Sequence, residues 1–260
     1  MKRNGSQSAG QELEDAPEAA STLAEVAYRR LRADIVAGVF EPGQPLRLEL
    51  LKQRYGLSFS PLREAMNRLQ TERLVITAAL RGFSVAPVSV EEMWDVIETR
   101  VLIECEALKR SIRDGDDDWE ARIVAAFHAL DLQVRRLGAA SGERADEDLS
   151  ALEIRHKEFH RSLIGACNSH RLLSLADQLY VETQRYRLPT LAGKVPAAVR
   201  DVTLEHRHIM DATLGRDTPK AQELLAAHYR RTAQFIEAKL FDADEIKMAS
   251  TVLRLEPEAG

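Results

Sequence analysis

The chain has 260 residues, of which 45% are hydrophobic, and its formal net charge is −5 at pH 7. This size and composition predict one large or two modest domains with a substantial core. No apolar run approaches the roughly 18 residues of a membrane span, and the two cysteines, Cys105 and Cys167, lack the spacing of a disulfide framework. These features exclude a membrane protein and a disulfide-rich secreted scaffold, and we expect a cytoplasmic protein. Residues 1–20 have no signal-peptide core and are expected to form a disordered tail.

Residues 21–88 have the pattern of a winged helix-turn-helix. A leading helix is predicted over 27–39, ending at Gly38 and Pro42-Gly43. A shorter helix follows over 48–55, and Gly56 closes it before a tight turn at 56–58. A short helix, a turn and a second helix form the helix-turn-helix arrangement that places a recognition helix in DNA.

The second helix of this pair, which begins near Ser60, has two different faces. Ser58 and Ser60 are good N-cap residues, and Pro61 suits the first helical turn. Apolar residues recur at i, i+3, i+4 and i+7, namely Leu62, Ala65, Met66 and Leu69. Away from that stripe lie Arg63, Asn67 and Arg68, which we expect to face DNA.

Two β-prone runs follow, at 74–77 and 83–86, and predict a hairpin wing with Arg81 and Gly82 near its tip. Charge favours the same interpretation. Between Tyr28 and Phe83 there are ten Lys or Arg and five Asp or Glu, a net +5 in a chain of net −5. A basic module on an acidic body is typical of a DNA-binding protein.

This region resembles the winged-helix domain of GntR-type transcription regulators. The resemblance depends on Pro42-Gly43, Leu46, Tyr55-Gly56-Leu57-Ser58, Ser60-Pro61-Leu62-Arg63-Glu64-Ala65 and Gly82-Phe83-Ser84-Val85. Two positions that often hold arginine in the family hold Phe59 and Glu49 here, so the operator sequence is left open. Together, the pattern and the resemblance give the expected DNA-contacting residues as Arg47, Ser58, Ser60, Arg63, Asn67, Arg68, Arg81 and Gly82.

From Val88 onward the pattern is helical, and we predict an antiparallel bundle of six or seven helices over 89–241. The first begins with a capping segment at Ser89 and Glu92 and ends near Gly115. The others are expected at 118–137, 149–166, 171–187, 195–214 and 219–240, with a weaker helix or tail over 242–260. The predicted fold class is therefore mainly α, a winged helix followed by a bundle.

Four histidines in this bundle have the placement of a ligand cluster. His156 and His160 are four residues apart and lie on one helix face. His206 and His228 come from two later helices, and a bundle can bring such side chains together in its core. Imidazole ligands favour zinc, nickel, copper or iron over magnesium or calcium. A lone histidine is more often a solvated or hydrogen-bonded residue, and that alternative stays open for each of them.

The bundle region resembles the FCD effector domain that follows the winged helix in the FadR branch of the GntR regulators. The resemblance rests on His156 to His160 with Leu163, Glu205-His206 with Ile209 and Ala212, and Asp217, Ala221 and His228. It implies a metal site formed by His160, His206 and His228, with His156 where the family usually has Asp. Further residues, namely Trp119-Glu120, Ala166-Cys167, Leu179-Tyr180 and Arg185-Tyr186-Arg187, are similar to the carbon-starvation-induced, glutarate-responsive regulators.

Such domains sense small carboxylates, and a carboxylate can pair with a guanidinium. Arg100 matches the arginine of the family's first effector-domain helix and is the main candidate clamp. Arg185, Tyr186 and Arg187 are weaker candidates, because an arginine-rich helix end before Pro189 is more often solvated.

The sequence therefore predicts a homodimeric regulator, expected to be a repressor, that binds a palindromic DNA operator. A small carboxylate effector and a divalent transition metal, zinc or nickel first, are its expected ligands. A helical metallohydrolase is a weaker alternative, because Glu158 is two residues past His156 and not adjacent to it as in the H-E-x-x-H helix. A winged-helix protein-interaction adaptor is a third.

Overall fold

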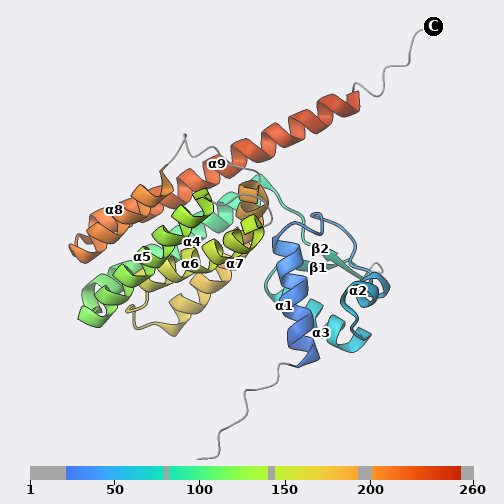
Figure 1. The fold of residues 1–260 in the computed structure, drawn as a ribbon, viewed down its shortest axis with the longest axis horizontal. Helices are drawn as coiled ribbons and strands as arrows, with labels where there is room; N and C mark the ends of the chain where they lie inside the picture. Colours follow the sequence, from blue (N-terminus) through green and yellow to red (C-terminus); the bar gives the residue numbers. More distant parts are fainter. Residues whose placement is uncertain (1–21, 79–81, 140–143, 193–200, 253–260) are drawn as a thin grey trace, which may run out of the picture.

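The computed structural model describes residues 22–78, 82–139, 144–192 and 201–252. It consists of a small winged helix and a larger helical bundle (Figure 1). The expected tail at 1–20 and Arg81 at the wing tip lie outside the described residues.

The winged helix contains three helices and a two-stranded antiparallel sheet. These are α1 (Leu23–Val36), α2 (Leu48–Tyr55), α3 (Phe59–Thr71), β1 (Val75–Ala78) and β2 (Gly82–Val85). Val75 pairs with Val85, and Ala78 pairs with Gly82. Strand β1 therefore starts one residue later than predicted from the sequence, and β2 starts one residue earlier. The chain at 43–46 adds backbone hydrogen bonds to Phe83 and Val85 and extends the sheet on its β2 side.

Local chemistry sets the ends of these helices. Thr22 accepts a hydrogen bond from the Glu25 amide and starts α1 four residues before its predicted start. Gly56, at φ +67°, ends α2 in the left-handed conformation that glycine adopts without strain. At the start of α3, Ser58 is the N-cap by backbone geometry but makes no side-chain capping bond. The prediction that Ser60 caps this helix is wrong, because the helix has already begun at Phe59.

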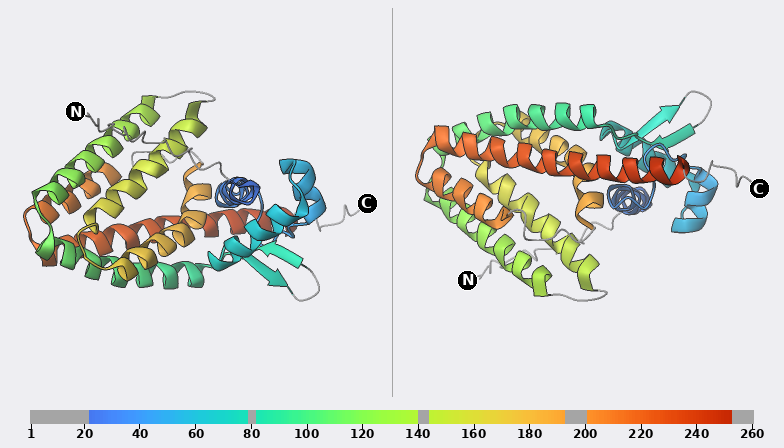
Figure 2. Two further views of the ribbon diagram at one scale, coloured as in Figure 1. Left: turned by 90° about the horizontal axis from the view of Figure 1, so that it is seen from below. Right: turned by 90° about the horizontal axis from the view of Figure 1, so that it is seen from above.

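Within the described ranges the bundle contains six helices. They are α4 (Val90–Asp114), α5 (Asp117–Ala139), α6 (Arg144–Leu163), α7 (His170–Ala192), α8 (Val202–Leu214) and α9 (Thr218–Val252). Figure 2 shows α4 and α9 side by side, with α7 against α4. Ser89 caps α4 through the Glu92 amide, as the sequence predicted.

Four predicted boundaries in the bundle are wrong. Helix α7 continues through Pro189 to Ala192, because the proline ends only one hydrogen bond of a helix already held by its neighbours. Helix α6 begins at Arg144, within the polar stretch expected to be a loop. Helix α8 begins at Val202, where Asp201 caps it, and α9 runs without a break past Asp242.

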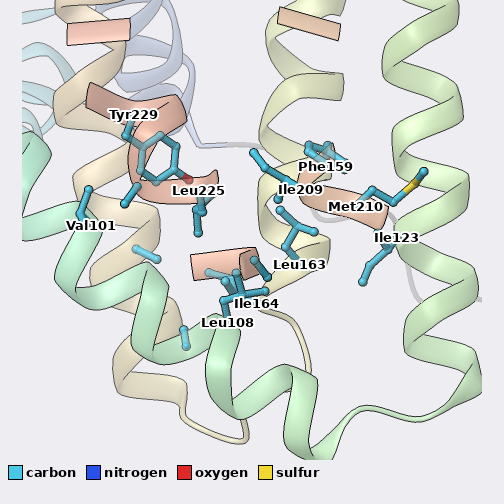
Figure 3. Close-up of a cluster of buried hydrophobic side chains, with 14 of the residues drawn as sticks. Val101, Leu108, Ile123, Phe159, Leu163, Ile164, Ile209, Met210, Leu225 and Tyr229 are labelled. Carbon is cyan, nitrogen blue, oxygen red and sulfur yellow. The ribbon is translucent and has the colours of Figure 1, made fainter. Parts of the chain in front are cut away.

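Each part has its own group of buried apolar side chains. In the winged helix, the apolar face of α3 packs against Leu31, Leu51 and Leu74, all almost fully buried. Figure 3 shows the bundle group, in which Phe159 and Leu163 of α6 lie near Ile209 of α8. Both tryptophans belong to the bundle: the Trp119 indole donates to the Ser162 carbonyl, and the Trp94 indole donates to Glu237.

Among the described residues, no helix combines the length and the apolar character that a membrane span requires.

Candidate metal centre and DNA-binding surface

The four predicted histidines converge. His156 and His160 come from α6, His206 from α8 and His228 from α9, and one nitrogen of each lies within 4.8 Å of the others. The side chains of His160, His206 and His228 are buried, and the ring of Phe159 closes the cluster on the apolar side at 5.1 Å from the His206 ring. Three separate helices thus bring imidazoles to one point, as the spacing predicted.

Hydrogen bonds from outside the cluster orient two of the rings. The Nδ1–H of His228 donates to Glu205 Oε2 at 2.9 Å, which turns its Nε2 lone pair inward. Tyr229 donates its hydroxyl proton to Glu104 at 2.5 Å, so the same oxygen accepts from His160 Nδ1 at 2.9 Å. These partners fix the tautomers that metal-binding histidines need.

The distances fit a transition metal. Metal–nitrogen bonds of about 2.0–2.1 Å place two imidazole nitrogens on one ion roughly 2.9–3.4 Å apart. The Nε2 atoms of His156 and His160 are 3.2 Å apart. This pair therefore already has the separation of two ligands on one ion.

The protonation states fit as well. Burial, together with the neighbouring Arg187 and the other rings, lowers the pKa of His156 well below its ordinary value. Burial and the nearby histidines lower the pKa of His160 in the same way. Both rings are therefore neutral at pH 7, the form that binds metals.

Arg187 is the charged group closest to the cluster. Its Nη1 lies 2.6 Å from His156 Nδ1, and its Nη2 donates to Glu153 and, at 2.9 Å, to Tyr180. Its Nε is buried without a hydrogen-bond acceptor among the described residues. The arginine-rich end of α7 is thus buried, and the alternative that it is solvated is wrong for Arg187, which is 8% exposed.

Because Arg187 donates to His156 Nδ1, that nitrogen must be the acceptor and the ring proton must be on Nε2. His156 then donates to His160 Nε2, and His160 donates to Tyr229. The result is one directed chain of hydrogen bonds from Arg187 to Glu104. In this state the Nε2 lone pair of His156 is not available to an ion.

Arg100, the main clamp candidate from sequence, is fully engaged. Its Nε pairs with Glu104 at 2.5 Å, and its two terminal nitrogens donate to Thr183 and Tyr229 at 3.1 Å each. The side chain reaches the histidines only through Tyr229. Tyr186 is buried and lies near the cavity, but its hydroxyl is directed to Glu92 at 3.3 Å.

A small cavity of about 20 Å³ adjoins the cluster. Its lining includes His156, His228, Arg187, Thr183 and Thr232. A space of this size holds about one water molecule. It therefore matches one ligand oxygen, and a larger group requires side chains to move.

On α3, Arg63 and Asn67 are exposed on one face, and Arg47, Ser58, Ser60 and Gly82 are exposed nearby in the fold. Arg68 is different. Its Nη1 donates to Glu25 at 2.7 Å and its guanidinium lies 3.8 Å from the Tyr28 ring centroid, so it ties α3 to α1. Lys52, which the sequence did not single out, lies 5.0 Å from the ring of Phe59 at the start of α3.

Sequence reasoning also missed the acidic residues around the histidines. Glu153 precedes His156 by three positions, and that spacing on one helix was the available signal for it. Glu205 stands directly before His206, but its bond is to His228 on another helix. Such a contact between helices has no signal in a single sequence.

Family models match both parts of the chain. Residues 23–85 match "Bacterial regulatory proteins, gntR family", and residues 95–231 match the FCD domain. The chain belongs to the GntR family of transcription regulators with an FCD domain. It is a DNA-binding regulator of this type, as the sequence predicted, and the metallohydrolase and adaptor alternatives are set aside.

Curated relatives agree with this assignment. The uncharacterized HTH-type transcriptional regulator BphR of Paraburkholderia xenovorans is 40% identical, over 80% of this chain and 82% of its own. The HTH-type transcriptional repressors GlaR and RspR of Escherichia coli are 35% and 33% identical, covering 77% and 80% of this chain and 90% and 86% of theirs.

Solved structures share the fold. Escherichia coli McbR/YncC superposes with a TM-score of 0.67 at 18% identity, covering 84% of this chain and 99% of that one. A GntR regulator from Rhodococcus sp. RHA1 gives 0.63 at 22% identity, with coverage of 83% and 97%. The hydrolase alternative also fails locally, since Glu158 is exposed and paired with Arg155.

Proposed function

We propose that this regulator is a repressor whose operator affinity is controlled by a small carboxylate bound beside a metal ion at the four-histidine cluster. The observation that carries the proposal is the convergence of four imidazole nitrogens within 4.8 Å next to a buried arginine. Zinc and nickel are the first candidates, since neutral imidazoles prefer them to hard cations.

Charge around the cluster supports an anionic effector. Apart from the solvent-exposed Arg231, which lies 3.4 Å from Glu205, the charged groups here are two arginines, Arg100 and Arg187, and three carboxylates, Glu104, Glu153 and Glu205. A divalent ion changes this balance from −1 to +1, which one carboxylate neutralises. The ion and the effector are therefore expected to bind cooperatively.

We assign the effector clamp to Arg187 in first place, with Tyr186 and Arg100 as supporting residues. Arg187 has an unused Nε–H and lies on the cavity, whereas each donor group of Arg100 already has an acceptor. The cavity of about 20 Å³ is too small for a whole carboxylate. Binding therefore requires Arg187 to leave His156, which also frees the Nε2 lone pair of His156.

For DNA recognition we propose a homodimer that binds a palindromic operator. Arg63 and Asn67 of α3 are the proposed base-reading residues. The proposed contacts to the DNA backbone are made by Arg47, Ser58, Ser60, Arg81 and Gly82. Arg68 serves to hold α3 against α1. The repressor role is supported by the names of GlaR and RspR.

The test combines metal analysis with operator binding. Protein purified without a His-tag or chelator is expected to contain about one zinc or nickel per chain, and glutarate, the first carboxylate probe, is expected to raise its melting temperature further. His206→Ala and His228→Ala are expected to lose both effects while keeping operator binding. His208→Ala is the matched control, because His208 is exposed on the same helix as His206. Absence of metal together with no response to added zinc or nickel would contradict the proposal.

A further inference from the structure

Three consecutive residues of α7 contact three different parts of the molecule. Arg187 contacts the histidine cluster, and Tyr186 contacts Glu92 in the first turn of α4. Arg185 points the other way, toward the winged helix, although it stands only two residues from Arg187. The sequence made Arg185 a further effector candidate, yet its guanidinium donates to the winged helix and not to the histidine cluster.

Arg185 contacts the backbone of the winged helix at two places, the turn between α3 and β1 and the segment that leads from β2 to α4. Its Nη1 donates to the Arg73 carbonyl at 3.1 Å, just after α3. Its Nη2 donates to the carbonyls of Ala86 and Pro87 at 2.6 and 2.5 Å, just after β2. Arg73 has a φ of +56°, an unusual value for a non-glycine residue, which marks this turn as sterically constrained.

Arg185 is 9% exposed, and its guanidinium makes only these backbone contacts among the hydrogen bonds of the described residues. The acceptors are backbone carbonyls and not a carboxylate, so the hydrogen bonds of Arg185 depend on the position of the backbone. Nearby, the Ala86 amide donates to the Leu74 carbonyl, so the α3–β1 turn and the segment after β2 are also bonded to each other. Val181, one turn earlier on α7, packs against the apolar core of the winged helix.

We propose that Arg185 is the residue that couples the sensing cavity to the DNA-binding domain, and that the turn Arg185–Arg187 transmits the change. This inference rests on the proposed sensing role of the cluster. When Arg187 leaves His156 to take a ligand, the last turns of α7 shift, and Arg185 carries the shift to the carbonyls at the base of the wing. The orientation of α3 relative to the bundle then changes.

A double-mutant cycle on operator affinity tests this coupling without any ligand. Operator Kd is measured at fixed salt for the wild type, Arg185→Gln, Arg187→Met and the double variant. If the two residues act through one route, Arg187→Met changes the operator Kd, and the double variant departs from the product of the single effects by at least about threefold. Arg171→Gln, at an exposed arginine near the start of the same helix, is the control and is expected to combine multiplicatively with Arg187→Met.

Amide hydrogen exchange gives a second measurement that does not depend on DNA. In Arg185→Gln and in Arg187→Met, exchange at the Ala86 amide is expected to become at least severalfold faster, with no change in Arg171→Gln. If Arg187→Met does not fold, Glu153→Gln replaces it, since it removes the ion-pair partner of Arg187 and leaves the arginine in place.

The inference would be overturned if the operator Kd of the double variant lies within about twofold of the product of the two single effects. It would also be overturned if Arg187→Met changes neither the operator Kd nor the exchange of the Ala86 amide. Failure of the proposed function looks different. In that case the wild type shows no response to zinc, nickel or glutarate, and the ligand-free cycle still gives its own result.

Discussion

Removal of the Glu205 carboxylate is expected to weaken metal binding without touching a metal ligand. Glu205 accepts the Nδ1–H of His228 at 2.9 Å, and its side chain is 15% exposed while that of His228 is 3% exposed. A hydrogen bond to a charged group at such a site contributes about 1.5–3 kcal/mol. Its loss corresponds to roughly a 10- to 150-fold rise in Kd, close to the 10- to 100-fold range typical of such supporting residues.

Two variants separate the charge from the hydrogen bond. Glu205→Ala removes both and is expected to show the full loss, whereas Glu205→Gln keeps an acceptor oxygen and is expected to lose about tenfold or less. Zinc affinity is measured by competition with a chromophoric chelator at pH 7.5. Arg231→Ala is the control, because Arg231 makes the second contact of Glu205, at 3.4 Å. Arg231 is exposed, so its removal is expected to change zinc affinity little. If Glu205→Ala binds zinc within threefold of the wild type, His228 is not held as a ligand in the way argued above.

Three further predictions concern DNA, the fourth ligand and pH. Arg63→Ala is expected to weaken operator binding by about 1–3 kcal/mol and to relax specificity at one base per half-site. Equal operator affinity of the wild type and Arg63→Ala at matched salt would refute this. Arg68→Ala is instead expected to lower the melting temperature of the winged helix with little change in specificity. His156→Asp is expected to keep zinc binding and to raise the stability of the metal-free protein, because the new carboxylate pairs with Arg187, and a lower melting temperature would contradict it. The lowered pKa of His156 and His160 means that the unfolded chain binds more protons below about pH 6.5. The free energy of unfolding of the metal-free bundle should therefore fall as pH drops below about 6.5, which urea titrations at pH 7.5 and 5.5 measure. Zinc should be retained to a lower pH than free imidazole would allow, which zinc competition measures.

Periodicity was sufficient to predict which parts of the chain are helical. The i, i+4 spacing of His156 and His160 and their placement in a bundle predicted a shared face, and the structure confirms it. The apolar stripe of α3 likewise predicted its buried side. Helix ends were less predictable: Pro189 was expected to stop α7, yet the helix continues to Ala192, and α7 as a whole packs against α4 and α1.

The functions of the arginines could not be read from spacing. Arg68 and Arg63 are both on the recognition helix, and only the position of Glu25 and Tyr28 on α1 distinguishes them. Arg100 was the main clamp candidate because of the family resemblance, whereas in the structure its donors are taken by Glu104, Thr183 and Tyr229. Arg187 is buried against His156 and Glu153 of α6, and such a contact between helices is a property of the tertiary structure.

The positions of the two tryptophans determine what fluorescence can report. Trp94 and Trp119 are the only tryptophans of the chain, and both are anchored in the bundle. Intrinsic tryptophan emission therefore follows the loss of bundle structure and does not register melting of the winged helix. Far-UV circular dichroism follows both parts, so a difference between the two melting curves isolates the DNA-binding region. A ligand screen read by tryptophan emission alone would find compounds that stabilise the bundle, including compounds that do not change the affinity for the operator.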